Sequence, residues 1–74
     1  MTTLTPTESA ALSRLLAARN CDPHAIVRYT DRVYVRIFMA FFVLDGDEFA
    51  HYDGMFPTPG LMAGVERITW EPAA

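Results

Sequence analysis

The fold is decided by the stretch VYVRIFMAFFVL, residues 33–44, in which Arg36 carries the only charge. Its last eight residues, 37–44, contain no polar side chain, and β-branched and aromatic residues dominate the whole stretch. Such side chains suit a pleated sheet. Asp45-Gly46 follows directly, and this pair is typical of a tight hairpin turn because Gly, and Asp more readily than most residues, accepts positive φ. The pattern predicts one continuous strand over 33–44, with a helix as the alternative for 37–44 alone.

An alternation of period two assigns six residues of this strand to each face of the sheet. One face takes Val33, Val35, Ile37, Met39, Phe41 and Val43, and the other takes Tyr34, Arg36, Phe38, Ala40, Phe42 and Leu44. The later part of the strand is therefore apolar on both faces, as expected of a central strand that is covered on both sides. Because a short chain has little material to cover both faces, Phe38, Phe42 and Leu44 are candidates for an interface with a second copy.

The chain has 74 residues, which is the size of one domain. A domain of this size buries only about 60% of its unfolded surface. Hydrophobic residues make up 51% of the sequence, so we expect either a dense core or an apolar surface that a partner covers. No apolar run reaches the ~20 residues that a membrane-spanning helix needs, and no signal peptide is visible. Cys21 is the only cysteine, so we expect no internal disulfide and a cytoplasmic location.

The net charge of −3 argues against direct binding of nucleic acid. The charges are also unevenly distributed along the chain. Residues 1–37 hold five arginines against three carboxylates, whereas residues 38–74 hold one arginine against six carboxylates. This asymmetry predicts either two oppositely charged faces or a fold that brings the two halves together.

Helix signals lie before the apolar stretch. Thr5 is placed as an N-cap, Pro6 as the first helical residue and Glu8 as the capping-box partner of Thr5. Asn20 is a suitable C-terminal cap, and Pro23 prevents further helix. We therefore expect a helix over about 5–20 whose apolar stripe packs on the sheet.

Three further strands are expected, over residues 25–29, 47–52 and 65–70. Turns separate the first two from the central stretch, and a loop rich in proline and glycine, MFPTPGLMAG over 55–64, precedes the last. The sequence therefore predicts a single α+β domain over 1–74. One N-terminal helix packs on a mostly antiparallel four-stranded sheet, in the order α-β-β-β-β.

Residues that could carry chemistry are sparse. Cys21, His24 and His51 are the only cysteine and histidine residues, and they lack the four-ligand set with paired spacing that is typical of structural zinc sites. A catalytic Cys–His pair needs a third group that orients the base. The sequence contains no glycine-rich phosphate loop and no nucleophile motif. We therefore expect no enzyme activity, no metal and no cofactor.

One candidate surface for a protein partner is acidic. Asp45, Asp47 and Glu48 crowd one hairpin tip, and Asp53 follows soon after. The spacing is similar to the start of a calcium loop, but Phe56 stands where the closing glutamate would be. The alternatives are a solvated turn and a patch that docks on a basic surface, since complementary charge increases association rate and selectivity.

The second candidate surface is the loop 55–64. It carries four large apolar side chains, which is unusual because loops run along the molecular surface. These are Met55, Phe56, Leu61 and Met62. They either fold back over the sheet as a lid or form an exposed contact patch, where flexible methionine and rigid aromatic side chains suit binding.

The sequence therefore favours a small acidic protein-binding module without enzyme activity. Inhibitors of host nucleic-acid-handling complexes, of the kind that phages and plasmids encode, form one class with this description. We expect a protein partner, with a basic surface as the counterpart of the acidic tip. The alternative is a homodimeric structural subunit, or an adaptor of a larger assembly.

Overall fold

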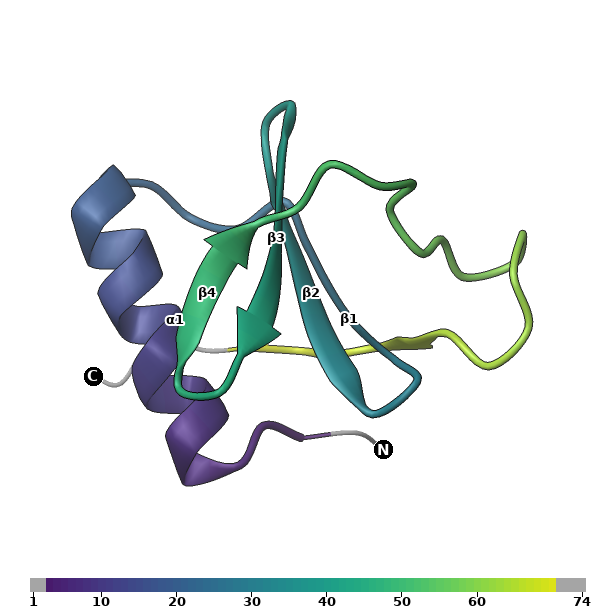
Figure 1. Cartoon of the computed structure of the whole chain (residues 1–74), viewed down its shortest axis with the longest axis horizontal. Helices are drawn as coiled ribbons and strands as arrows, with labels where there is room; N and C mark the ends of the chain where they lie inside the picture. Colours follow the sequence, from purple (N-terminus) through teal and green to yellow (C-terminus); the bar gives the residue numbers. More distant parts are fainter. Residues whose placement is uncertain (1–2, 71–74) are drawn as a thin grey trace.

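The computed structural model describes residues 3–70, which form one helix and one antiparallel sheet (Figure 1). The helix is α1 (Pro6–Arg19). The strands are β1 (Ala25–Tyr29), β2 (Arg32–Ile37), β3 (Ala40–Asp45), β4 (Glu48–His51) and β5 (Glu66–Arg67), in the spatial order β4-β3-β2-β1-β5. This confirms the α+β class, with one helix packed on a mostly antiparallel sheet.

The predicted start of the helix is confirmed atom by atom. The N–H of Glu8 donates to Thr5 Oγ1 at 3.2 Å, and Glu8 Oε1 accepts from the N–H of Thr5 at 2.9 Å, which completes a capping box. Pro6 occupies the first turn, where its missing N–H costs nothing. The helix ends at Asn20, whose φ of 53° is the left-handed conformation of a C-terminal cap.

The prediction of one strand over 33–44 is wrong. The stretch forms β2 and β3, which are joined by a two-residue turn at Phe38-Met39, with Ile37 paired to Ala40. Two-residue hairpins need positive φ in the turn, which normally selects glycine or asparagine. Phe38 adopts this conformation, with φ of 53°. No residue of the stretch signals a turn by its type, and the sequence pattern therefore missed it.

The alternation of faces within β2 is as predicted, but the turn exchanges the two faces for the residues of β3. Residues that lie directly opposite each other in a sheet share a face, so the pairing of Ile37 with Ala40 joins odd positions of β2 to even positions of β3. The face that contacts α1 consequently carries a core of buried residues from both strands. It comprises Leu12, Leu16, Ile26, Val33, Val35, Ile37, Phe42 and Ile68.

The other face of the sheet is covered by the chain that follows β4. Its core is Val27, Tyr34 and Val43, and half-buried side chains including Phe56 pack against it. Pro57 is among the most deeply buried residues of the protein. Residues 52–65 leave the sheet at the end of β4 and sweep around to β5 (Figure 1). We call the two sides of the sheet the helix face and the loop face.

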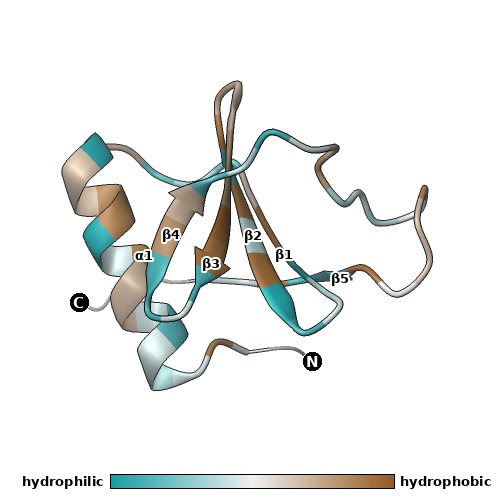
Figure 2. Ribbon diagram, in the orientation of Figure 1, coloured by the Kyte–Doolittle hydropathy of each residue, from teal (hydrophilic) through white to brown (hydrophobic). Residues whose placement is uncertain are grey.

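The last predicted strand, 65–70, is shorter than expected, because only Glu66–Arg67 pairs with β1 as β5. A further backbone bond, from the N–H of Ile68 to the carbonyl of Ile26 at 2.9 Å, continues this alignment. Ile68 points inward and lies in the helix-face core. Hydrophobic residues occupy most of β3 and the turn before it, and in β2 they are interrupted by Arg32 and Arg36 (Figure 2).

Candidate functional site

The turns and loops gather at two ends of the sheet that differ in chemistry. The Phe38-Met39 turn lies at one end, and the chain leaves β4 at that same end, since the N–H of Tyr52 donates to the carbonyl of Phe41 at 2.8 Å. The Asp45–Glu48 turn lies at the opposite end, close to the start of α1 (Figure 1). We call these the apolar end and the acidic end.

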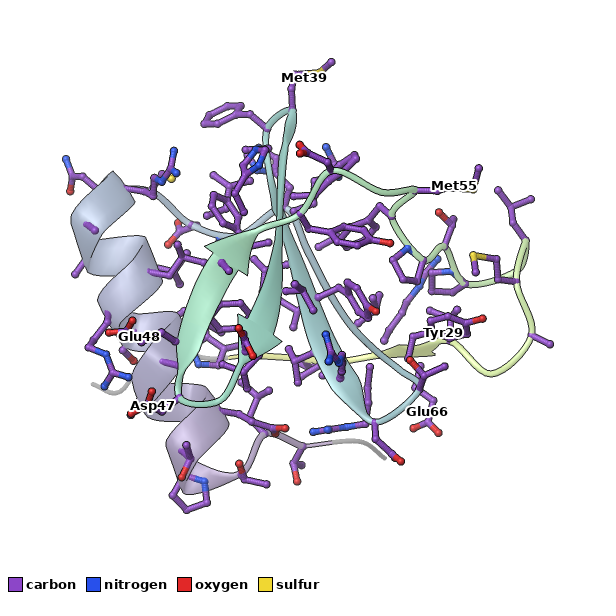
Figure 3. All side chains as sticks on the ribbon, in the orientation of Figure 1. Tyr29, Met39, Asp47, Glu48, Met55 and Glu66 are labelled. Carbon is purple, nitrogen blue, oxygen red and sulfur yellow. The ribbon has the colours of Figure 1, made fainter. Side chains whose placement is uncertain are left out.

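Large apolar side chains are exposed at the apolar end. The exposed fraction is 92% for Met39, 63% for Phe38 and 80% for Met55. Met39 and Met55 both point away from the sheet (Figure 3). Single exposed apolar residues are common on protein surfaces, but two large ones side by side in one turn, Phe38 and Met39, indicate a contact site.

The backbone of Phe38 is held on both sides by side chains from neighbouring strands and connectors. Its N–H donates to Nδ1 of His24 at 3.0 Å, and its carbonyl accepts from Nη1 of Arg36 at 2.9 Å. The rings of His24 and Phe38 also pack, with centroids 4.4 Å apart. These contacts offset the unfavourable positive φ of a bulky residue, and such strained positions concentrate at functional sites. The turn is thus a fixed apolar tip.

Part of the loop 55–64 covers the sheet as a lid, and part of it is exposed, so each of the two roles that the sequence left open applies to some of its residues. Phe56 and Pro57 fold over the loop face, where the rings of Phe56 and Phe41 lie 5.2 Å apart. Met55 and Leu61 are exposed, Leu61 to 84%, and Met62 is half-buried. The loop is therefore a lid that carries two exposed apolar side chains, and Phe56 is not part of an exposed patch.

The predicted acidic patch is split. Asp45, Asp47 and Glu48 are all exposed at the acidic end, where Arg14 of the helix donates to the carbonyl of Asp47 at 2.5 Å. Asp53 lies at the apolar end, 3.3 Å from Nδ1 of His51. Asp47 and Met55 therefore occupy opposite ends of the molecule (Figure 3), and the acidic tip and the loop do not form one continuous surface.

Two of the three residues predicted for a dimer interface lie in the core of a single copy. Phe42 is 3% exposed and packs beneath the guanidinium of Arg19, whose Cζ lies 4.7 Å from its ring centroid. Leu44 is half-buried against the helix-face core. Both faces of the sheet are covered by the chain itself, which removes the reason for expecting an interface at Phe42 and Leu44. Phe38 is exposed because it lies in a turn.

The cysteine and the two histidines of the sequence do not form one site. Cys21 is half-buried beside the helix-face core, and His51 is exposed near Asp53. Nδ1 of His24 accepts the Phe38 N–H, so that nitrogen is not free to act as a base for Cys21. Within residues 3–70, no three His, Cys, Asp or Glu side chains lie close enough to hold a metal ion.

One ion pair ties the helix to the sheet. Glu8 accepts two bonds from the guanidinium of Arg28, at 2.7 and 3.0 Å, and both side chains are mostly buried. The Arg28 guanidinium lowers the pKa of the Glu8 carboxyl, and Glu8 in turn raises the pKa of Arg28. The same carboxylate closes the capping box with Thr5. We assign this pair to stability.

Comparison of the chain with protein-family models, with curated proteins and with solved structures gave no match. In the part of the chain that the structure describes, α1 is too short and too polar to cross a membrane. Sequence reasoning missed the apolar tip. The exposure of Met39 follows from the turn, which no local signal marked.

Proposed function

We propose that this chain is a protein-binding module without enzyme activity, and that its partner contacts the apolar end of the sheet. The observation that carries the proposal is the fixed tip, at which Met39 is 92% exposed and Phe38 is 63% exposed. A binding site that is already ordered loses less entropy when the partner docks. Methionine and aromatic side chains are also enriched at interfaces.

The hydrogen bonds around Phe38 favour this proposal over the alternative that the turn only reverses the direction of the chain. A turn that only reverses the chain is served by glycine or asparagine, which adopt positive φ at little cost. Here the position holds a large aromatic residue, and His24 and Arg36 hold its backbone in place. The arrangement keeps a large apolar group exposed to solvent in a defined position, which is expected where a partner uses it.

The narrower proposal, a partner that handles nucleic acid and offers a basic surface, depends on the acidic end. Asp45, Asp47 and Glu48 are exposed there. The two ends favour different contacts, because docking through carboxylates weakens strongly with salt and docking through apolar side chains does not. Binding that keeps its affinity at high salt therefore supports the apolar end as the contact.

Site-specific photo-crosslinking in the producing cell tests the proposal. A benzophenone amino acid is placed at Met39, at Glu48 or at Ser13, which is exposed on the helix and serves as the control. We expect a protein adduct from position 39 that is absent at position 13. An adduct from position 48 alone would show that the partner contacts the acidic end instead. Equal labelling at 39 and 13 would contradict the apolar tip as a binding site.

The same experiment addresses the homodimeric alternative. An adduct that contains two copies of this chain, and no other protein, would show that the tip contacts a second copy. An adduct with a different protein supports the module. Sedimentation equilibrium of the isolated chain is the independent measurement, because a self-associating tip yields a mass above 8.3 kDa that falls on replacement of Met39 by serine.

A further inference from the structure

The loop face holds a cavity that the sequence pattern did not indicate. It measures about 470 Å³ and lies between the sheet and the segment 56–59. Arg36 and Arg67 line it from the sheet, His24 lines it from the connector before β1, and Phe56 and Pro57 line it from the loop. We call this cavity the arginine cleft. Its volume falls within the range of about 300–1,000 Å³ that is usual for small-molecule sites.

The strand register brings the two arginines to the same face. Arg36 pairs with Ala25, and Arg67 pairs with Val27 on the other side of β1. Ala25 and Val27 are two residues apart on one strand, so their side chains share a face. Val27 belongs to the loop-face core, which places both arginines on the loop face. Two strand spacings and two residues along β1 separate their Cα atoms by about 12 Å, which arginine side chains can bridge around one ligand.

The cleft is electropositive in a protein whose net charge is −3. Among the residues that the structure describes, no aspartate or glutamate lines it. Within residues 3–70, Arg67 has no carboxylate partner, and the guanidinium of Arg36 bonds only to the carbonyl of Phe38. Arg28, by contrast, faces the helix and pairs with Glu8. Arg36 and Arg67 therefore keep most of their donors for a ligand.

The remaining walls complement these charges. His24 accepts the Phe38 N–H at Nδ1, so in the neutral ring Nε2 carries the hydrogen and is a donor. Phe56 and Pro57 add an apolar wall. A planar guanidinium binds two oxygens of a phosphate in a bidentate manner. Two guanidinium groups together also balance the charge of a phosphate monoester, which is between about −1.5 and −2 near pH 7.

We propose that the arginine cleft binds a small organic phosphate. Arg36 and Arg67 contact the phosphate group, and the organic part lies against Phe56 and Pro57. His24 and Arg36 line the cleft and also bond to the backbone of Phe38. The proposal is nevertheless distinct from the binding of a protein at the apolar tip, because Arg67, Phe56 and Pro57 line the cleft and make no bond to the tip. Either one can fail without the other.

Titration of the full chain with phenyl phosphate tests the proposal, with calorimetry for affinity and amide NMR for location. We expect saturable binding that shifts the amide signals of Val27, Thr58 and Arg67. Inorganic phosphate should bind more weakly, since it lacks an organic part to contact the apolar wall. Benzoate should also bind more weakly, since a carboxylate carries less charge. Equal affinity for benzoate and phenyl phosphate, or no saturable binding of phenyl phosphate, would overturn the proposal.

Arginine variants locate the site. Arg67→Gln should weaken phenyl phosphate binding by about tenfold or more, since it removes charge-assisted hydrogen bonds to the phosphate oxygens. Arg67→Lys keeps the positive charge but loses the planar guanidinium fork. Its affinity for phenyl phosphate should therefore lie between those of the unmodified chain and Arg67→Gln. Arg32→Gln is the matched control, because Arg32 is exposed on β2 and lies outside the cleft. The same loss in Arg32→Gln and Arg67→Gln would show general charge attraction and contradict the cleft.

Discussion

The backbone N–H of Phe38 donates a hydrogen bond to Nδ1 of His24, 3.0 Å away and 14 residues earlier in the chain. This bond links the connector after the helix to the turn between β2 and β3. The N–H of His24 itself donates to the carbonyl of Arg36 at 2.9 Å, which extends the pairing of β1 with β2. His24 therefore fixes the conformation of the apolar tip from a distant part of the sequence.

Removal of the His24 side chain should loosen the tip. In His24→Ala the Phe38 N–H loses its acceptor and the ring contact at 4.4 Å is lost. We expect faster hydrogen exchange of the Phe38 amide and a decrease of about 1 kcal/mol in the free energy of unfolding. His51→Ala is the control, since His51 is exposed. Unchanged exchange at Phe38 in His24→Ala would contradict the role given to His24.

Two phenylalanines of the apolar stretch should differ strongly in how much their substitution changes stability. Phe42 is 3% exposed, so Phe42→Ala should lower the free energy of unfolding by about 3–5 kcal/mol. Phe38 is 63% exposed and has positive φ, which asparagine adopts more easily. We expect Phe38→Asn to change stability by less than about 1 kcal/mol, in either direction. Urea denaturation of both variants checks this, and equal losses would contradict the two-strand hairpin.

The Glu8–Arg28 pair should make stability depend on pH in a defined direction. The Arg28 guanidinium holds the pKa of Glu8 below its ordinary value, so the folded state favours the ionised carboxylate. The stabilisation is complete above the unfolded pKa of about 4.3 and is lost as the pH falls through the lower folded pKa. Glu8→Gln keeps a capping-box side chain and removes the charge.

We therefore expect Glu8→Gln to lower the free energy of unfolding by about 1–2 kcal/mol at pH 7. The difference from the unmodified chain should shrink below about pH 4, as Glu8 becomes protonated there. Denaturation at several pH values is the measurement. Glu48→Gln, which changes an exposed carboxylate of the acidic end, should have little effect throughout. A difference for Glu8→Gln that stays constant with pH would exclude the ion pair as its cause.

A side chain at position 54 should destabilise the protein as long as the Tyr52 side chain stays in its present position. A Cβ at Gly54 would overlap the hydroxyl and ring of Tyr52. That ring packs edge-on against Tyr34 with centroids 5.2 Å apart, and its hydroxyl donates to the carbonyl of Met55 at 3.3 Å. Gly54→Ala should therefore lower the free energy of unfolding by about 1–3 kcal/mol. In a Tyr52→Ala background the same change should cost much less, and an equal cost in both would rule out the overlap.

The helix and the strand content of this protein could be predicted from local signals. Thr5, Pro6 and Glu8 act within one turn of the chain, so their capping geometry follows from residue type alone. The exposed carboxylates of the Asp45–Glu48 turn could also be predicted from the sequence, because Asp45-Gly46 is a strong hairpin signal. The distance between that turn and Met55 could not be predicted, because it depends on which end of the sheet each loop reaches.

The packing of one helix on an antiparallel sheet of β-branched and aromatic residues follows from residue type and spacing, since period, caps and propensity are local properties. The reversal of the apolar stretch at Phe38 depends instead on contacts between distant parts of the chain. Residue type disfavours that turn, and strand pairing together with the bonds from His24 and Arg36 stabilises it. The arginine cleft has the same origin, because Arg36 and Arg67 meet only through the register of β2 and β5 on β1.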